Sequence, residues 1–252
     1  NKYVVGIYDL EKDFSLVSNP NGQWSYGWSM TEKPGRRGPF RELALRRQTI
    51  FPGWWRDPLH PTDDLYYPCV EKNVGVNTVY AIPSGKISMN AGNADRSRSM
   101  VRWTSPCQLS HSTGSPRRRC IARVFGSFGP GGSPGQHCEL SINGVTMLLA
   151  TCERSTSFNF LFDATRDPRK TATTGSVEFA VDSSSRNVGS NTPVSIAVEV
   201  VSVATGWLPC PFEAVRCGVG SIGALVPLST LHQLRGSGGD GSGGVLVFSA
   251  PS

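Results

Sequence analysis

Residues 51–67, FPGWWRDPLHPTDDLYY, hold the side chains best suited to bind a ligand. Two tryptophans and two tyrosines lie beside an arginine and three aspartates, and prolines stiffen the segment. The apolar face of a sugar ring packs on an aromatic ring, while fixed polar groups bond the hydroxyls. This composition predicts a glycan-binding platform, with the alternative that the aromatics plug one end of a domain. The predicted platform residues are Trp54, Trp55, Arg56, Asp57, Tyr66 and Tyr67.

The aspartates of this segment point to two further kinds of chemistry. Asp63 and Asp64 offer the hard oxygen ligands that Ca²⁺ prefers, although their spacing matches no EF-hand loop. We therefore expect no cofactor other than a structural calcium ion at this pair. Paired carboxylates also serve hydrolases, but the chain has no His-Glu-x-x-His motif and no phosphate-cradling glycine loop. We predict that the protein is not an enzyme.

The overall charge is basic, at +6 with an isoelectric point near 9.1. Such a balance fits nucleic acid, an anionic glycan or solubility alone. The one basic run, residues 117–119, lies among Ser, Gly and Pro without interleaved aromatics. It predicts a solvated loop, with contact to a phosphate or polyanion as the alternative. We expect no nucleic-acid partner. We expect no membrane insertion either, because no apolar run approaches the length of about 20 residues that a span needs.

The seven cysteines include no Cys-x-x-Cys pair, which argues against a zinc ribbon or a thioredoxin site. Local pairing predicts three disulfides and leaves Cys69 free or bonded to another chain. Disulfides persist in oxidising compartments, so we expect an extracellular or cell-surface protein. The candidate pairs are Cys107 with Cys120, Cys138 with Cys152, and Cys210 with Cys217.

The segments that must position these side chains have the composition of β-strands along almost the whole chain. Eleven segments of strand composition are separated by Gly, Pro, Asn and Ser, and Asn143-Gly144 is typical of a type I′ hairpin turn. Only residues 41–50 have a helix-like composition. This pattern predicts an all-β fold, an antiparallel β-sandwich or jelly roll. The segments are 14–18, 24–30, 78–82, 86–90, 99–105, 120–128, 138–142, 145–152, 157–164, 176–182 and 193–203.

Alternating apolar residues in three of these strands predict core-facing stripes, because successive side chains of a strand point to opposite faces. The stripes are Trp24, Tyr26 and Trp28; Phe158, Phe160 and Phe162; and Val177, Phe179 and Val181.

The composition changes near residue 206, which predicts two parts. Residues 1–205 form the sandwich, and residues 206–252 form an extension with a Gly/Ser-rich linker and a short apolar end, VLVFSA. That end could add a strand to the sheet edge of a neighbour and so build a fibre. Because the chain begins at Asn1 without a leader, we expect a processed or partial chain.

Four stretches carry a resemblance to a known family. They are FSLVSNPNGQWSYGW (14–28), PSGKISMNAGNADRSRSMVRWTSP (83–106), the strands CIARVFGSFG and CELSINGVTML, and the closing pair that begins at Gly175. Across roughly residues 9–203 the chain resembles extracellular jelly-roll modules of bacterial surface and sorting-signal proteins and of some algal proteins. The resemblance implies a surface or carbohydrate-binding-like module without a catalytic residue set.

The chain departs from that family at three places. The family's His-Pro-Gly is Asn90-Ala91-Gly92 here, its short turn is replaced by the loop 107–120, and an acidic residue before the last strand is replaced by Asn191-Thr192. The last departure weakens a calcium site borrowed from related sandwiches.

Together these observations predict a non-catalytic extracellular or cell-surface module that binds a polysaccharide or other glycan, or attaches to a surface. The alternative is a structural subunit that assembles with copies of itself into a filament, fibril, appendage or surface layer.

Overall fold

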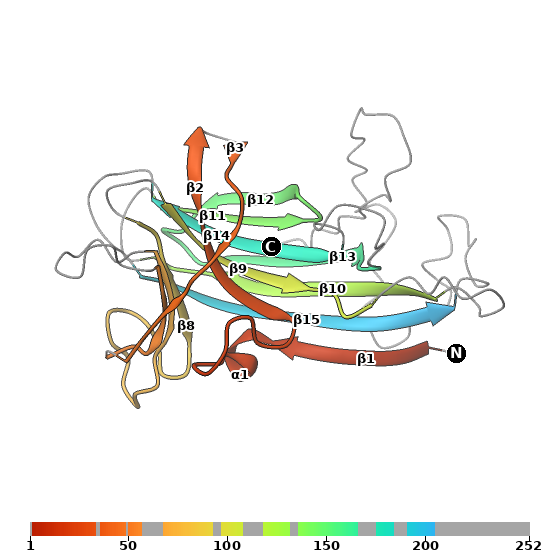
Figure 1. Cartoon of the computed structure of the whole chain (residues 1–252), viewed down its shortest axis with the longest axis horizontal. Helices are drawn as coiled ribbons and strands as arrows, with labels where there is room; N and C mark the ends of the chain where they lie inside the picture. Colours follow the sequence, from red (N-terminus) through yellow and green to blue (C-terminus); the bar gives the residue numbers. More distant parts are fainter. Residues whose placement is uncertain are drawn as a thin grey trace.

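The structure, a computed structural model, describes residues 2–33, 36–48, 50–56, 68–92, 97–107, 118–131, 136–165, 175–183 and 191–204. Two antiparallel sheets pack face to face in these residues, with one short helix (Figure 1). Each sheet buries one apolar face against the other, as amphipathic strands require. The predicted all-β sandwich is confirmed. The predicted extension, residues 206–252, lies outside the described residues.

Sheet A contains eight strands, and the longest of them, β15 (Asn191–Ala204), pairs with three others. Strand β1 (Lys2–Asp9) pairs with β15 beside the main path. Along that path the order is β13 (Thr156–Asp163), β10 (Arg118–Phe128), β15 (Asn191–Ala204), β8 (Ile87–Asn90), β7 (Cys69–Lys72), β6 (Gly53–Trp55) and β5 (Leu45–Arg47).

Sheet B contains seven strands and faces sheet A (Figure 1). The strand β4 (Arg41–Glu42) pairs with β2 beside the main path. Along that path the order is β12 (Val145–Thr151), β11 (Gln136–Ile142), β14 (Ser176–Ser183), β9 (Ser97–Thr104), β2 (Trp24–Lys33) and β3 (Arg36–Arg37).

The three predicted stripes meet in the core between the sheets. Tyr26 and Phe179 have no exposed surface, and the phenylalanines of β13 are 3–8% exposed. Trp28 is half-buried and packs against the edge of the same cluster. The Asn143-Gly144 turn has φ angles of 51° and 80°, as a type I′ hairpin requires. Alternation in the sequence therefore assigned these faces correctly.

Two of the predicted disulfides are present, Cys107–Cys120 and Cys138–Cys152. Cys69 is buried without a disulfide, and the third predicted pair, Cys210 with Cys217, lies outside the described residues. In the described part of the chain, no helix has the length and apolar character to cross a membrane. The two bridges are compatible with an extracellular location.

Three segments differ from their predicted structure. Residues 14–18 form bends rather than a strand, and residues 78–82 form a tight turn closed by one bridge between Val79 and Ile82. The helix-like segment 41–50 contains the short strands β4 and β5 instead, because pairing with β2 and β6 supplies their hydrogen bonds. Tertiary pairing here overrides local helix propensity.

The Asn-Pro-Asn-Gly stretch holds the start of β2 in place. The Asn19 side chain donates to the carbonyls of Tyr26 (2.7 Å) and Leu43 (2.8 Å), and its oxygen accepts from the Tyr26 amide (2.8 Å). Asn21 donates to the carbonyl of Asp13. Because these bonds satisfy backbone groups at a sheet edge, the stretch has a structural role here.

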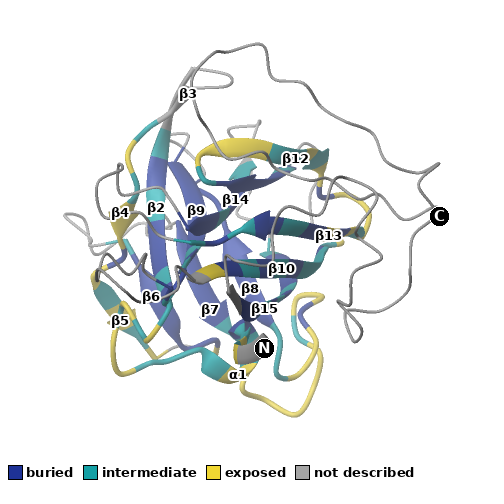
Figure 2. Ribbon diagram, turned by 90° about the vertical axis from the view of Figure 1, so that its right-hand side faces the viewer, coloured by how far each residue is buried: buried dark blue, intermediate teal, exposed yellow. Residues whose placement is uncertain are grey.

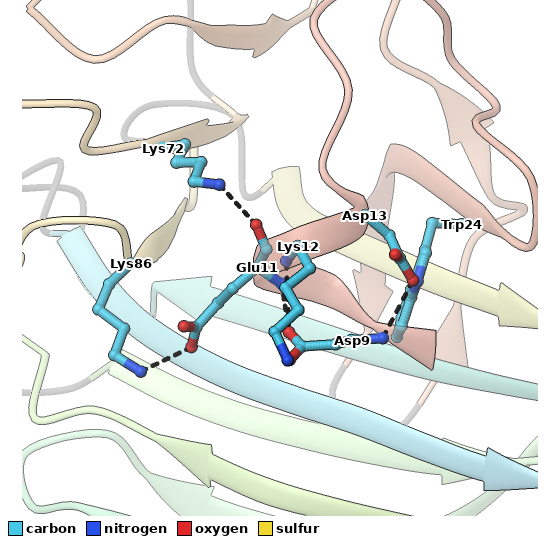
Figure 3. A network of polar contacts seen from close by, with 7 residues as sticks. All are labelled: Asp9, Glu11, Lys12, Asp13, Trp24, Lys72 and Lys86. Carbon is cyan, nitrogen blue, oxygen red and sulfur yellow. Dashed lines mark hydrogen bonds and ion pairs between the residues drawn. The ribbon is translucent and has the colours of Figure 1, made fainter. Parts of the chain in front are cut away.

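A polar network around the helix α1 (Leu10–Asp13) joins the two sheets at one end (Figure 3). Lys86 donates to the Glu11 carboxylate at 2.7 Å, and Lys72 donates to the Glu11 carbonyl. Asp13 accepts from the Trp24 indole of sheet B at 3.2 Å. Each polar group has a partner within the chain, so we assign this network to stability rather than to ligand binding.

Candidate ligand-binding site

The two tryptophans of the predicted platform lie on β6, and each is only 7% exposed. Trp54 points into the main core and donates from its indole nitrogen to the Ser15 carbonyl at 2.7 Å. Trp55 points to the other face and packs with Cys69 and Leu45. Neither indole offers an open face to a sugar ring, so their burial fits the alternative in which the aromatics fill the interior.

The remaining residues of the predicted site have different outcomes. Arg56 is half-buried and follows β6 directly, where its amide donates to the Pro68 carbonyl at 3.2 Å. The others lie outside the described residues, and their roles stay predictions. These are Asp57, Tyr66 and Tyr67 of the glycan platform and Asp63 and Asp64 of the calcium site.

Arg56 and a second arginine lie over the ring of Trp28. The guanidinium carbon of Arg56 is 4.3 Å from the ring centroid, and that of Arg41 is 5.0 Å from it. Arg41 reaches the ring because β4 pairs with β2 in a register that places Arg41 opposite Trp28. Such cation–π contacts are worth about 0.5–1 kcal/mol at exposed sites.

Strand β5 carries two more arginines, which point to opposite faces of the strand because they are consecutive residues. Arg46 is exposed, and Arg47 lies 5.2 Å above the ring of Trp55. We call these four residues, Arg41, Arg46, Arg47 and Arg56, the arginine rim. Figure 2 shows β4 and β5 at the surface of the sandwich, in contrast to the buried strands β9 and β14.

A buried carboxyl group lies on the next strand, β7. Glu71 is 4% exposed, and burial raises its pKa from 4.5 to about 8. The neighbouring Cys69 thiol has a pKa well above its ordinary value, first because of burial and then because of Glu71. At pH 7 Glu71 is therefore mostly protonated and adds little negative charge beside the rim.

Unlike the two buried tryptophans, Tyr80 exposes its aromatic ring to solvent. It is 71% exposed, at the tip of a turn in which Tyr80 and Ala81 have φ angles of 48° and 62°. Positive φ is uncommon for bulky residues, and such outliers cluster at functional sites. The ring of Phe51 packs edge-on against Tyr80 with centroids 6.1 Å apart.

Hydrogen bonds from a buried side chain and across the turn fix the loop that carries Tyr80. Asn73, 1% exposed, donates to the carbonyls of Asn77 and Ile82 at 2.8 Å each and accepts from the Gly75 amide at 2.9 Å. Val79 and Ile82 exchange both backbone hydrogen bonds across the turn. A ring on a loop fixed in this way loses little conformational entropy when a ligand packs against it.

A second group of charged side chains lies on the face of sheet B that points away from the core. Arg102 donates to Glu178 at 2.6 and 2.9 Å, and Arg98 forms an ion pair with Glu139. The Arg98 side chain is 6% exposed, and the Asp182 carboxylate lies 3.8 Å from its Nε. Burial lowers the pKa of Arg98, and the nearby carboxylates oppose that effect. We call these five residues the ion-pair layer; both arginines lie against carboxylates of the same sheet.

Sequence reasoning missed both Tyr80 and the ion-pair layer. Residues 78–82 read as a strand because Tyr-Ala is not a usual turn pair. The layer had a usable signal, since Arg98 and Arg102 alternate with core residues of β9, and Glu178 and Asp182 do so on β14. The described residues contain no group of three or more His, Cys, Asp or Glu side chains that could hold a metal ion.

Comparisons with known proteins give no family for this chain. No family model matches it, and a search of curated proteins finds no match. Among solved structures, an α-L-arabinofuranosidase with bound arabinose shows 10% identity and a TM-score of 0.26 over 61% of this chain. The match spans 22% of that protein, about a fifth of its length, and at this TM-score it carries no argument.

Proposed function

We propose that this protein is a non-catalytic, extracellular or cell-surface β-sandwich that binds glycans and thereby attaches to a surface. The single observation that carries the proposal is Tyr80, an exposed aromatic ring on a turn that the interior holds in place. Sugar-binding sites commonly combine such a ring with nearby fixed polar groups. The rim supplies these groups at the β5–β6 hairpin, whose connection contains Phe51, the residue packed against Tyr80.

The location follows from the cysteines. Two disulfides support an oxidising compartment, because reducing compartments keep thiols reduced. The proposal contains no catalytic step. A turnover screen that found hydrolysis abolished by Asp63→Asn would contradict this part of it.

A glycan array with matched variants of Tyr80 tests the function. Tyr80→Asn keeps a residue that tolerates positive φ but removes the ring, whereas Tyr80→Phe keeps the ring. We expect Tyr80→Asn to weaken binding at least about tenfold and Tyr80→Phe to weaken it less than about threefold, given the stabilisation from ring stacking. If binding survives Tyr80→Asn but is lost in a folded Trp54→Ala or Trp55→Ala variant, the tryptophans rather than Tyr80 form the binding site. No binding to any glycan would refute the function.

Self-assembly into a filament or surface layer is the second candidate, and exposed edge strands support it. Strand β12 ends sheet B with Val145 and Leu149 56% and 67% exposed, and β1 carries Ile7 at 67%. Unpaired edges with apolar side chains favour addition of another chain. Light scattering with and without residues 236–252 tests this candidate, and a strict monomer in both samples would exclude it.

A further inference from the structure

Among the strands at the ends or sides of the two described sheets, β12 is the only one without a charged residue. It ends sheet B and, within the described residues, pairs with β11 alone. The others are protected as edge strands usually are, by charge and by short length. Strands β3, β4 and β5 have two or three residues and contain arginine, β13 ends in Asp163, and β1 runs from Lys2 to Asp9. The seven residues of β12, VTMLLAT, include neither charge nor proline.

Strand β12 also exposes apolar side chains. Val145 and Leu149 are 56% and 67% exposed, and Thr146 and Thr151 are exposed as well. Figure 2 shows β12 mostly as exposed and intermediate, in contrast to the buried strands β9 and β14 of the same sheet. Valine and threonine favour an extended backbone, and an uncharged edge of this composition favours the addition of another strand. The composition and the exposure together indicate a surface for strand pairing.

Both ends of β12 are fixed to β11. The hairpin turn 143–144 joins the first residue of β12 to β11, and Cys152, directly after its last residue, is bonded to Cys138 of β11. Between these ends, the Thr146 hydroxyl donates to the Glu139 carboxylate of β11 at 2.8 Å. A strand held in this way loses little conformational entropy when a second strand pairs with it.

A second copy of the same strand fits this edge. Two β12 strands related by a two-fold axis run antiparallel, match in length and bring no like charges together. The register with β11 shifts between Leu140 and Ser141, and residues 148–151 pair regularly beyond that bulge. Leu149 lies opposite Glu139 of the ion-pair layer, so its side chain is on the outer face of sheet B. A two-fold axis at Leu149 therefore brings the exposed leucines of both copies together.

We propose that two copies of this chain pair through β12 about a two-fold axis near Leu149, which joins their sheets B into one continuous sheet. The inference rests on self-assembly, the second candidate function above, and names its surface; it does not depend on glycan binding. Pairing removes exposed apolar surface of Val145 and Leu149 from water. Because a two-fold contact closes on itself, it forms a pair rather than a filament.

Charge exchange at Leu149 tests the inference, with analytical ultracentrifugation of the full chain as the measurement. Leu149→Lys places like charges opposite each other in the pair, as does Leu149→Glu. Each variant alone should raise the dimer dissociation constant about tenfold, because the substitution acts twice in a symmetric pair. An equimolar mixture of the two variants should pair within about threefold of the native affinity, since opposite charges then meet.

Ile7→Lys is the matched control, because Ile7 is also 67% exposed but lies on β1. It should change the dissociation constant less than about twofold. Hydrogen exchange of the native chain at about 10 and about 500 µM needs no variant, so it decides the question if the Leu149 variants do not fold. At the higher concentration, the amides of β12 should exchange at least about threefold more slowly, while those of β1 stay unchanged.

The outcomes separate this inference from the function on which it rests. A dimer that persists unchanged in Leu149→Lys, or that Ile7→Lys weakens as much, would overturn β12 as the surface and leave self-assembly intact. Slower exchange confined to β1 would have the same meaning. A strict monomer at both concentrations would refute the inference and self-assembly together.

Discussion

Arginine has opposite surroundings in the ion-pair layer and in the arginine rim. Arg98 is 6% exposed and lies against the carboxylates of Glu139 and Asp182. Arg41 is exposed and lies over the indole of Trp28. The layer pairs both of its arginines with acids from neighbouring strands, and Arg102 also lies 3.8 Å from the centroid of the Phe40 ring. In the rim, three of the four arginines lie over indole rings.

This difference shows two ways in which the fold accommodates an arginine side chain. A buried charge without its counter-charge costs several kcal/mol, so the layer has to be matched internally. An exposed guanidinium on a ring keeps its hydration and costs little. The indole rings of Trp28 and Trp55 lie close to three of the rim arginines and so limit the positions of those side chains.

The largest expected effect comes from breaking the layer. Arg98→Met leaves the buried Glu139 and the half-buried Asp182 without the guanidinium group beside them, so we expect the free energy of unfolding to fall by about 3 kcal/mol. Urea denaturation measures this change. Arg123→Gln, on the surface of β10, serves as control and should cost less than about 1 kcal/mol. A similar small loss in Arg98→Met would show that the layer is not matched as described.

The titration of Glu71, next to the rim, should give a pH-dependent change of intermediate size in the free energy of unfolding. Its pKa is about 8 in the folded state and near 4.5 when unfolded, so the folded state holds a proton that the unfolded state has lost. Stability is then fully present below pH 4.5 and falls as the pH rises towards 8. Between pH 5 and 7.5 this contribution is on the order of 3 kcal/mol.

Glu71→Gln removes the titrating group and keeps a similar shape. Thermal unfolding at pH 5, 6, 7 and 7.5 should show a steeper loss of stability in the native chain than in Glu71→Gln. Parallel curves for the two proteins would mean that Glu71 is already ionised in the folded state. Its negative charge would then offset part of the positive charge of the neighbouring arginines.

The smallest effect on folding is expected in the rim itself. Arg41→Lys keeps the positive charge but loses the planar fork that lies over Trp28. We expect the free energy of unfolding to change by less than about 0.5 kcal/mol. Affinity for a glycan that the array identifies should fall about three- to fivefold, because an ammonium group cannot bind two oxygens side by side. Unchanged affinity in a binding titration would show that charge alone matters at this position.

The alternation of apolar and polar residues predicts much of the sandwich but little of the candidate site. The stripe of Phe158, Phe160 and Phe162 gave the correct buried face because a strand exposes every second residue to each side. Trp54 and Trp55 are neighbours on β6, so they point to opposite faces. Trp54 is buried in the main core, and Trp55 is covered by Leu45 and Cys69 of the neighbouring strands. A three-residue strand inside a proline-bounded segment has too short a pattern to reveal this.

The stacking of Arg41 on Trp28 was hidden for a different reason. It depends on the register between β2 and the two-residue strand β4, which no local pattern encodes. Tyr80 was hidden because its turn is held by Asn73 and by the bridge between Val79 and Ile82 rather than by a turn-forming pair. Both features arise from contacts between segments.

The most direct test of the proposed glycan site is NMR observation of the arginine side-chain Nε–Hε groups during titration with an oligosaccharide that the glycan array identifies. We predict that the signals of Arg41 and Arg56 shift progressively with ligand, while those of Arg98 and Arg102 stay unchanged in their ion pairs. Shifts confined to Arg98 and Arg102, with Arg41 and Arg56 unmoved, would place the ligand on the ion-pair layer and contradict the rim as the binding surface.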